Sequence, residues 1–264
     1  MKRRTPFVLC LSVVLLSLGQ LACEARTNVS YQKLKIGSVW MNVITANLNS
    51  PSVRVTPAVA RYGIGHCESF RSLLRRTRPA AAIDGTFFCT RTLRPTGDIV
   101  IDGQLVYRGY LGMAVTIDDY DNIRFVESGA YRWSDYKSVL AAGPSLLIGG
   151  KVAVYPKDQG FRSGVHFSRR VRAAVGITRQ NKLLLVTTTR SAYLSQLARA
   201  MRSIGCVDAA GLDGGSSTGL YCKGRLISNP SRGMTNCLLV YDDLTSYDRH
   251  HDSLCPTQRF AGGS

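Results

Sequence analysis

The chain has 264 residues, of which 45% are hydrophobic and 19% charged, so it can bury a sizeable core and is neither a disordered tail nor a small disulfide-held domain. Lys and Arg number 34 against 17 Asp and Glu, and the resulting formal charge of +17 indicates attraction to anionic partners. Nucleic acid is not favoured as that partner, because the sequence has no zinc-finger spacing, no RNA-recognition signature and no basic helix.

The N-terminal segment has the layout of a secretory signal peptide. Basic residues at positions 2–4 precede an apolar run over residues 7–18, and small residues follow at Ala22, Cys23 and Ala25. We therefore expect residues 1–25 to be removed and the chain to be exported to the periplasm or outside the cell. An uncleaved N-terminal membrane anchor and a lipoprotein attached through Cys23 are alternatives. No stable membrane span is expected beyond this segment.

Six cysteines remain if this segment is removed. An even number in an exported chain predicts disulfides, although small buried hydrophobic side chains are the alternative. The sequence contains no Cys-x-x-Cys pair, which disfavours a structural zinc site. These cysteines are Cys67, Cys89, Cys206, Cys222, Cys237 and Cys255.

Short strands account for most of the expected secondary structure. Alternation of apolar and polar residues predicts strands within residues 31–48 and 53–59. Further on, pairs of apolar runs flank short turns, and Asp102-Gly103 is the clearest turn signal because glycine tolerates positive φ. The hairpins predicted in this way cover residues 99–107, 113–126, 146–154 and 173–187.

Two segments have the pattern of helices. An apolar stripe runs from Leu194 to Ile204, with Ser191 as the expected N-terminal cap and Gly205 as the stop. The other helix covers roughly residues 68–78 and ends before Pro79.

Hairpins outnumber helices, so we expect a single α+β domain over residues 26–264, built on mixed or antiparallel sheet. A loose tail is expected beyond Tyr247.

Polar turns at the ends of predicted strands are the candidates for chemistry. Asp213 follows a strand and precedes Gly214, Gly215, Ser216 and Ser217. Glycines allow backbone N–H groups to turn toward a ligand oxygen and hydroxyls add donors, so this loop is suited to phosphate or sugar. A turn without a ligand is the alternative.

Two more turns and one arginine complete the candidate set. Asp84-Gly85 ends an apolar strand and precedes Thr86 and Phe87. Gly143-Pro144 precedes another strand. Arg172 begins the strand over residues 173–177, where an inward-facing charge needs an anionic partner.

Four strings around these residues, AAIDGTFF, AAGPSLLIGG, RAAVGI and LDGGSST, resemble in order and spacing the catalytic domain of the phosphodiester glycosidase family. The resemblance covers about residues 80–242. Many members of that family carry Asn where Asp84 stands and a third glycine where Ser216 stands, so this chain departs from the pattern at two positions.

The resemblance implies hydrolysis of a sugar-1-phosphodiester, similar to N-acetylglucosamine-1-phosphodiester, at the anomeric carbon, on cell-envelope or exopolysaccharide material. Arg172 would hold the phosphate and Asp213 would act as nucleophile or base. Asp84 would stabilise the positive charge at the anomeric carbon or bind sugar hydroxyls. The remaining expected binding residues are Gly85, Thr86, Phe87, Gly143, Pro144, Gly214, Gly215, Ser216 and Ser217.

Two other functions stay open. The string Gly215-Ser216-Ser217-Thr218-Gly219 satisfies the G-x-S-x-G pattern of serine esterases, but strands rather than a helix are predicted after it. A non-catalytic protein that binds anionic envelope glycopolymers fits the composition equally well. No cofactor is expected with certainty, although a divalent cation such as Ca²⁺ could bind near Asp213. The sequence does not indicate the oligomeric state.

Overall fold

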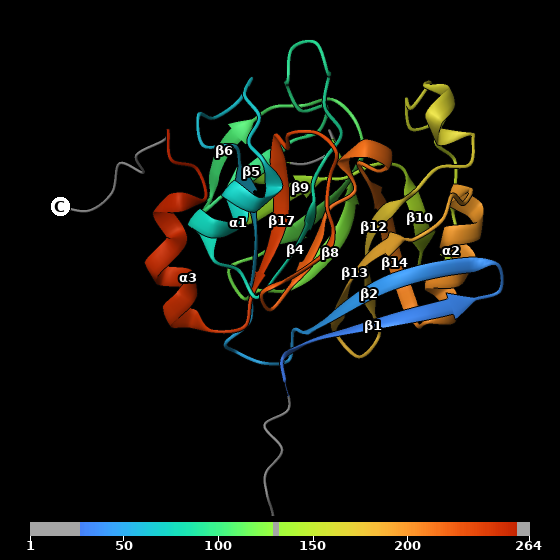
Figure 1. The fold of residues 1–264 in the computed structure, drawn as a ribbon, viewed down its shortest axis with the longest axis horizontal. Coiled ribbons are helices and arrows are strands. Elements are labelled where there is room, and N and C mark those ends of the chain that lie inside the picture. The colour runs from blue at the N-terminus through green and yellow to red at the C-terminus, as the bar shows by residue number, and fades with distance from the viewer. Residues whose placement is uncertain (1–26, 129–131, 258–264) are drawn as a thin grey trace, which may run out of the picture.

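The protein consists of three antiparallel sheets with three short helices at their edges and faces (Figure 1). This arrangement comes from a computed structural model that describes residues 27–128 and 132–257. The predicted signal peptide at residues 1–25 lies outside the described residues.

The largest sheet has seven strands. Its strand order is β1-β2-β13-β12-β14-β10-β11, and all of its pairs are antiparallel. Its strands are β1 (Val29–Ile36), β2 (Val39–Asn47), β13 (Lys182–Thr188), β12 (Ala173–Thr178), β14 (Cys206–Leu212), β10 (Ser145–Ile148) and β11 (Lys151–Val152).

Two five-stranded sheets complete the fold. The first has the order β16-β15-β4-β17-β3 and the second the order β6-β5-β9-β7-β8. The first contains β16 (Arg225–Ser228), β15 (Leu220–Cys222), β4 (Ala81–Asp84), β17 (Asn236–Tyr241) and β3 (Arg54–Val59). The second contains β6 (Gln104–Tyr107), β5 (Ile99–Ile101), β9 (Ser138–Ala141), β7 (Met113–Ile117) and β8 (Ile123–Glu127).

Strand β13 shows how the seven-stranded sheet is buried on both faces. Leu183 and Leu185 belong to the main hydrophobic core, whereas Leu184 and Val186 pack in a second core with the helix α2 (Leu194–Ser203). Successive side chains of a strand point to opposite faces, so the continuous apolar run of β13 fills both cores. The main core also contains buried side chains from both five-stranded sheets, which makes the described chain one α+β domain, as predicted.

The predicted hairpin turns adopt the conformations that their residues favour. Asp102 and Gly103 have φ values of 50° and 72°, and Asn181 between β12 and β13 has φ 56°. Both turns lie where the sequence places them. The predicted hairpin over residues 146–154 also forms, but β11 is only two residues long.

The two predicted helices form, with one difference at a cap. Helix α1 (Phe70–Thr77) begins after Ser69, whose side chain accepts a hydrogen bond from the Ser72 amide. The N-cap residue of helix α2 is Tyr193, whose amide donates a hydrogen bond of 3.0 Å to the Gln196 side chain, and not Ser191 as expected. Ser191 instead precedes a backbone bridge between Ala192 and Arg170, which holds this segment extended.

The expected loose tail is wrong up to residue 257. A third helix, α3 (Leu244–His250), follows β17, and Asp243 caps it by accepting hydrogen bonds from two backbone amides. Leu254 is fully buried in the main core, and the Arg76 side chain donates to the Ser253 carbonyl. The polar residues of this segment led to the prediction of a loose tail. No pattern in the sequence indicated the burial of Leu254 or the hydrogen bond from Arg76 to Ser253.

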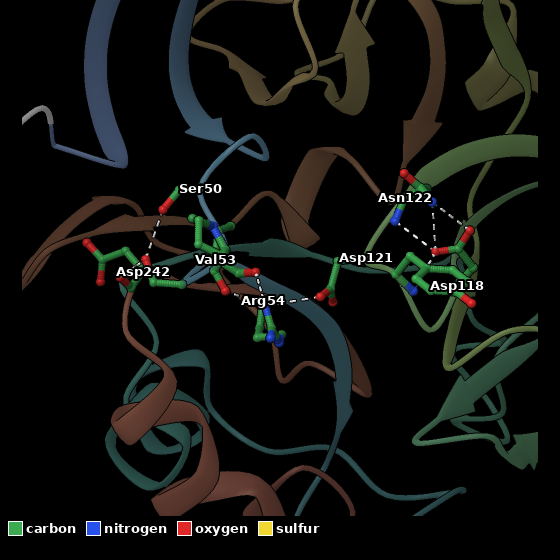
Figure 2. Close-up of polar contacts among 10 residues, drawn as sticks. Ser50, Val53, Arg54, Asp118, Asp121, Asn122 and Asp242 are labelled. Atoms are coloured by element: carbon green, nitrogen blue, oxygen red, sulfur yellow. Dashed lines mark hydrogen bonds and ion pairs between the residues drawn. The ribbon is translucent and has the colours of Figure 1, made fainter.

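Ion pairs and turns at the sheet edges are shown in Figure 2. Arg54 at the start of β3 forms an ion pair of 3.0 Å with Asp121, in the turn between β7 and β8. Asp118 shapes the same turn by accepting hydrogen bonds from the backbone and side chain of Asn122. The Arg54–Asp121 pair thus joins a strand of one five-stranded sheet to a turn of the other.

The structure does not show the disulfides that the sequence predicts. Cys67, Cys89, Cys206, Cys222 and Cys237 have free thiols. Cys206, Cys222 and Cys237 are buried, in agreement with the alternative that these residues serve as small hydrophobic side chains. No helix within residues 27–128 and 132–257 is both long and apolar enough to cross a membrane.

The anchoring role of Arg76 leads to a stability prediction. Arg76 forms a buried ion pair of 2.9 Å with Glu68, so Arg76→Gln should cost about 3–5 kcal/mol of unfolding free energy in urea at neutral pH. The exposed neighbour Arg75 provides the control, because Arg75→Gln should change stability by no more than about 0.5 kcal/mol. Equal effects of the two substitutions would contradict the anchoring role.

The difference in stability between wild type and Arg76→Gln should also depend on pH. Burial raises the pKa of Glu68, but hydrogen bonds from Arg76 and Ser72 and the charge of Arg76 outweigh it, and the net pKa is lowered from 4.5. A carboxyl group whose pKa is lowered by folding stabilises the folded state at pH values above its unfolded-state pKa. This stabilisation is lost as the pH falls through the folded-state pKa. The difference between wild type and Arg76→Gln should therefore shrink in acid.

Candidate active site

Two strand ends from different sheets meet at the candidate site. Asp84 is the last residue of β4, and Asp213 directly follows β14. The Asp213 amide donates a hydrogen bond of 3.1 Å to the Gly85 carbonyl, which joins the two strand ends. Two of the predicted carboxylates are thus brought together although 129 positions separate them in the chain.

A cavity of about 470 Å³ opens next to these strand ends. Its wall contains six of the residues predicted from the sequence together with others that were not predicted. The predicted ones are Phe87, Arg172, Asp213, Gly214, Gly215 and Ser216, and the others are Phe88, Thr90, Ser163, Val165, His166, Arg170, Val171 and Arg232.

Asp213 is paired with an arginine in the cavity wall. Arg232 Nη2 lies 2.7 Å from Asp213 Oδ2, and Arg232 Nε donates to Ser217 Oγ at 2.6 Å. The guanidinium also lies over the ring of Phe88, 4.4 Å from its centroid. Burial raises the pKa of Asp213, and Ser217 and Arg232 only partly oppose this rise.

Asp84 lies beneath the cavity and has no exposed surface. Its Oδ1 accepts a hydrogen bond of 3.0 Å from the Gly219 amide, and its Oδ2 has no hydrogen-bond partner. Burial raises the pKa of Asp84 well above its ordinary value, and the charge of nearby Asp213 raises it further. The two carboxyl groups therefore favour the protonation state in which Asp213 is charged and Asp84 is neutral. Direct contact of Asp84 with a sugar, as expected from the sequence, does not fit this position.

Arg172 brings a second positive charge into the cavity. Its side chain is buried, and its Nε donates to the Ala192 carbonyl at 3.1 Å while Nη2 donates to the Ser168 carbonyl. No carboxylate of the described residues lies within ion-pair distance of this guanidinium, so carbonyl dipoles replace the expected anionic partner. Burial, and then the charge of Arg170, lower its pKa to about 10, which leaves Arg172 charged at neutral pH.

His166 is a site residue that the sequence prediction missed. It packs between Phe87 and Phe161, with ring centroids 5.1 Å and 5.0 Å away, and its Nδ1 has no partner within the described part of the chain. Burial, followed by the charge of Arg172, lowers the pKa of His166 to about 4. The ring is therefore neutral at physiological pH and can accept or donate a hydrogen bond in the cavity.

The predicted glycine-serine loop contributes less than expected. The Gly215 amide donates to the Val171 carbonyl at 2.9 Å, so it is not free to bind phosphate as the sequence suggested. Gly214 is needed because a Cβ at this position would lie 2.6 Å from the Val171 carbonyl oxygen. Ser217 is fully buried and holds Arg232 rather than facing the cavity. Ser216 remains in the wall as a candidate donor.

The other predicted binding residues support the site from behind. A Cβ at Gly85 would overlap Asn236, whose side chain accepts a hydrogen bond of 2.8 Å from the Thr86 amide. Gly143 fits against Phe87 and the Gly211 carbonyl, and the Pro144 carbonyl accepts from the Gly211 amide. None of Gly85, Thr86, Gly143 and Pro144 lines the cavity.

The serine esterase alternative does not fit the local structure. Ser217 lies in a 3₁₀ turn (Gly215–Ser217) that leads into strand β15, whereas a nucleophile elbow leads from a strand into a helix. The buried Ser217 hydroxyl already accepts from Arg232. A metal centre has no support either, because no group of three or more His, Cys, Asp or Glu side chains in the described ranges is arranged to hold an ion.

Arg232 and His166 escaped the sequence prediction for a common reason. Both lie outside the strands and α-helices, in residues 229–235 and 155–171, where neither periodicity nor a motif marks a position. The only available signal was proximity in sequence: Arg232 follows the motif loop by fewer than 20 residues, and His166 precedes Arg172 by six.

Comparisons with known proteins agree with the four motifs. The family model described as phosphodiester glycosidase matches residues 77–241. No curated protein matches the chain.

Two solved structures have a similar fold. A hypothetical protein from Synechocystis superposes with a TM-score of 0.72 at 17% identity, over 81% of this chain and 62% of that protein. The catalytic domain of zebrafish N-acetylglucosamine-1-phosphodiester alpha-N-acetylglucosaminidase, auto-inhibited by its pro-peptide, superposes with a TM-score of 0.65 at 22% identity, over 81% and 82% of the two chains. Identities this low establish the shared fold alone.

The environment of His166 generates a measurable prediction. Its imidazole resonances should titrate with a midpoint near pH 4 in an NMR titration, instead of the ordinary 6.5. Arg172→Gln should raise this midpoint, because it removes a positive charge that opposes protonation of the ring. A midpoint near 6.5 in the wild type would show that the ring is not buried against Phe87 and Phe161.

Proposed function

Since this chain belongs to the phosphodiester glycosidase family, we propose that it hydrolyses a sugar-1-phosphodiester at the anomeric carbon. Water would replace the phosphate at that carbon, and the products would be the free sugar and a phosphomonoester. The substrate class we favour is similar to an N-acetylglucosamine-1-phosphodiester of the cell envelope or of an exopolysaccharide. Removal of residues 1–25 and export would place the protein next to such material.

The observation that carries this proposal is the uncompensated charge of Arg172 beside Asp213. A buried guanidinium without a carboxylate partner is costly, and a bound anion reduces that cost. The cavity that Arg172 lines also holds Arg170 and Arg232 against the single carboxylate of Asp213. Its wall therefore carries more positive than negative charge, which suits a phosphate.

This charge also supports catalysis and not only binding. A phosphodiester carries about one negative charge, whereas the departing phosphomonoester approaches two at neutral pH. Arginines fixed in a low-dielectric cavity interact more strongly with the second state than with the first. The same groups therefore bind the transition state better than the substrate, which is the condition for acceleration.

Asp213 is the group that we assign to the anomeric carbon, as nucleophile or as the base that activates water. Phosphate is a good leaving group, so the protonating acid of ordinary glycosidases is less necessary. Arg232 and Ser217 hold the carboxylate in place. Burial strengthens Asp213 as a base because it raises the pKa.

Asp84 is better placed as a positioning residue. Its bond to the Gly219 amide and the bond from the Asp213 amide to Gly85 hold the two loops together. A neutral Asp84 adds no second negative charge beneath Asp213. The family position often holds Asn, which fills the same space without a charge.

The position of bond cleavage tests the reaction. We expect the enzyme to release a phosphomonoester without label when an aryl N-acetylglucosamine-1-phosphodiester is hydrolysed in ¹⁸O-water, because water attacks carbon and not phosphorus. Asp213→Asn should slow turnover by about a hundredfold or more with the fold intact. Asp208 lies on the preceding strand β14, outside the cavity, and its side chain accepts a hydrogen bond from the Gly149 amide. Asp208→Asn is therefore the matched control and should leave turnover unchanged.

Three results would count against the proposal in different ways. Label in the phosphate would indicate a phosphodiesterase that attacks phosphorus. Full activity of Asp213→Asn would remove this residue from the reaction. Tight binding of the sugar phosphate without any turnover would favour the alternative of a non-catalytic glycopolymer-binding protein.

A further inference from the structure

A surface of alternating basic and aromatic side chains extends from the rim of the cavity. We call it the aromatic–basic strip. It begins next to Arg170 in the cavity wall and consists of Arg169, Tyr193, Arg190, Trp40, Lys35 and Lys33. We propose that this strip binds the continuation of an anionic saccharide polymer whose end occupies the cavity, so that the substrate is a polymer. The polymer assignment rests on the proposed function.

Cation–ring contacts gather the strip around two rings, Tyr193 and Trp40, and residues 190–193 connect the two groups along the chain. Arg169 lies over the ring of Tyr193 at 5.9 Å, and Arg190 lies over the ring of Trp40 at 5.8 Å. Lys35 and Lys33 lie over the same indole ring at 5.2 Å and 6.0 Å. The indole of Trp40 on β2 therefore gathers two cations from the neighbouring strand β1 and one from the loop after β13.

Backbone pairing ties the strip to the cavity. Arg170, which lines the cavity, forms a two-bond bridge with Ala192, the residue before Tyr193. The Thr189 amide donates to the Trp40 carbonyl at 2.9 Å. Arg190, the next residue in the chain, therefore lies beside strand β2. A chain that leaves the cavity past Arg170 would meet Arg169 and Tyr193 first and Trp40 next.

The cations of the strip lack acidic partners in the sequence as well as in the structure. No Asp or Glu occurs between Glu24 and Glu68, or between Asp158 and Asp208, and these two segments supply every member of the strip. Lys33, Lys35, Arg169 and Arg190 are exposed and form no ion pair within the described part of the chain. Like charges gathered this way disfavour folding, and a bound polyanion relieves their repulsion.

The aromatic rings favour a saccharide over a nucleic acid. Tyr193 is 44% exposed and Trp40 is half-buried, so each places part of an aromatic ring among charges at the surface. A sugar ring with anionic substituents matches this alternation of apolar face and charge. The cavity at the start of the strip is the place where the proposed function puts a sugar phosphate. Single-stranded nucleic acid could also stack on the rings, and it is therefore one arm of the test.

Equilibrium binding to dextran sulfate tests the strip. Neutral dextran and a single-stranded DNA of matched charge are the comparison ligands. The triple substitution Lys33→Gln, Lys35→Gln and Arg190→Gln should weaken binding of dextran sulfate by about tenfold or more and reduce its salt dependence, because fewer counterions are released. An unchanged melting temperature of the variant establishes that its fold is intact.

A matched control removes the same charge elsewhere. Arg71, Arg75 and Arg78 are exposed arginines on and after α1 that line a separate cavity. Figure 1 shows α1 on the side of the molecule away from β1 and β2. Substituting these three by Gln should reduce binding much less than the strip variant does. Equal losses in the two triple variants, or tighter binding of the DNA than of dextran sulfate, would overturn the proposal.

Failure of the strip and failure of the proposed function are distinguishable, because the readout here is binding and not turnover. Strip-dependent binding without hydrolysis of any phosphodiester would overturn the enzymatic function and leave the strip in place. Hydrolysis of the small phosphodiester without strip-dependent binding would overturn the strip alone.

Discussion

The hydrogen bond from the Asp213 amide to the Gly85 carbonyl is the contact on which the candidate site depends. It joins the end of β14 in the seven-stranded sheet to the end of β4 in a five-stranded sheet. A parallel contact from the Gly143 amide to the Gly211 carbonyl joins β14 to the segment between β9 and β10. A Cβ at Gly143 would lie 2.9 Å from the Gly211 carbonyl oxygen, and a Cβ at Gly85 would overlap the Asn236 side chain. The glycines of these motifs therefore mark positions where the backbone packs closely against its neighbours.

Once the strand ends meet, burial decides how the charges are distributed. Asp84 and Asp213 cannot both be charged at low cost in one desolvated region, and only Asp213 has an arginine partner. The charge of Arg172 is left for a ligand because carbonyl oxygens, and no carboxylate of the described residues, surround it. Burial, and then the charge of the same Arg172, lower the pKa of His166 and keep the ring neutral. A positively charged cavity with one reactive carboxylate follows from these few contacts.

Local patterns in the sequence predicted the hairpins, the Asp-Gly turn and helices α1 and α2, because alternation, Asp-Gly and apolar stripes act over short distances. They did not predict β9 or β17, which lie in the interior of their sheets. Asp213, Arg172 and Phe87 could be placed in one site through the order of the motifs. Arg232 and His166 could not, since they reach the cavity from irregular segments through contacts such as Arg232 to Asp213, which depend on the completed fold. The role expected of the Gly215 amide failed for a related reason. Its partner, the Val171 carbonyl, is contributed by the segment that precedes β12. Helix α3 was missed because its anchors, Tyr247 and Leu254, are isolated among polar residues.

A crystal structure with a non-hydrolysable N-acetylglucosamine-1-phosphonate would test the central claim directly. The account predicts that the phosphonate oxygens accept hydrogen bonds from the Arg172 guanidinium and that the anomeric carbon faces the Asp213 carboxylate. A ligand bound elsewhere, or one that turns its phosphonate away from Arg172, would contradict it.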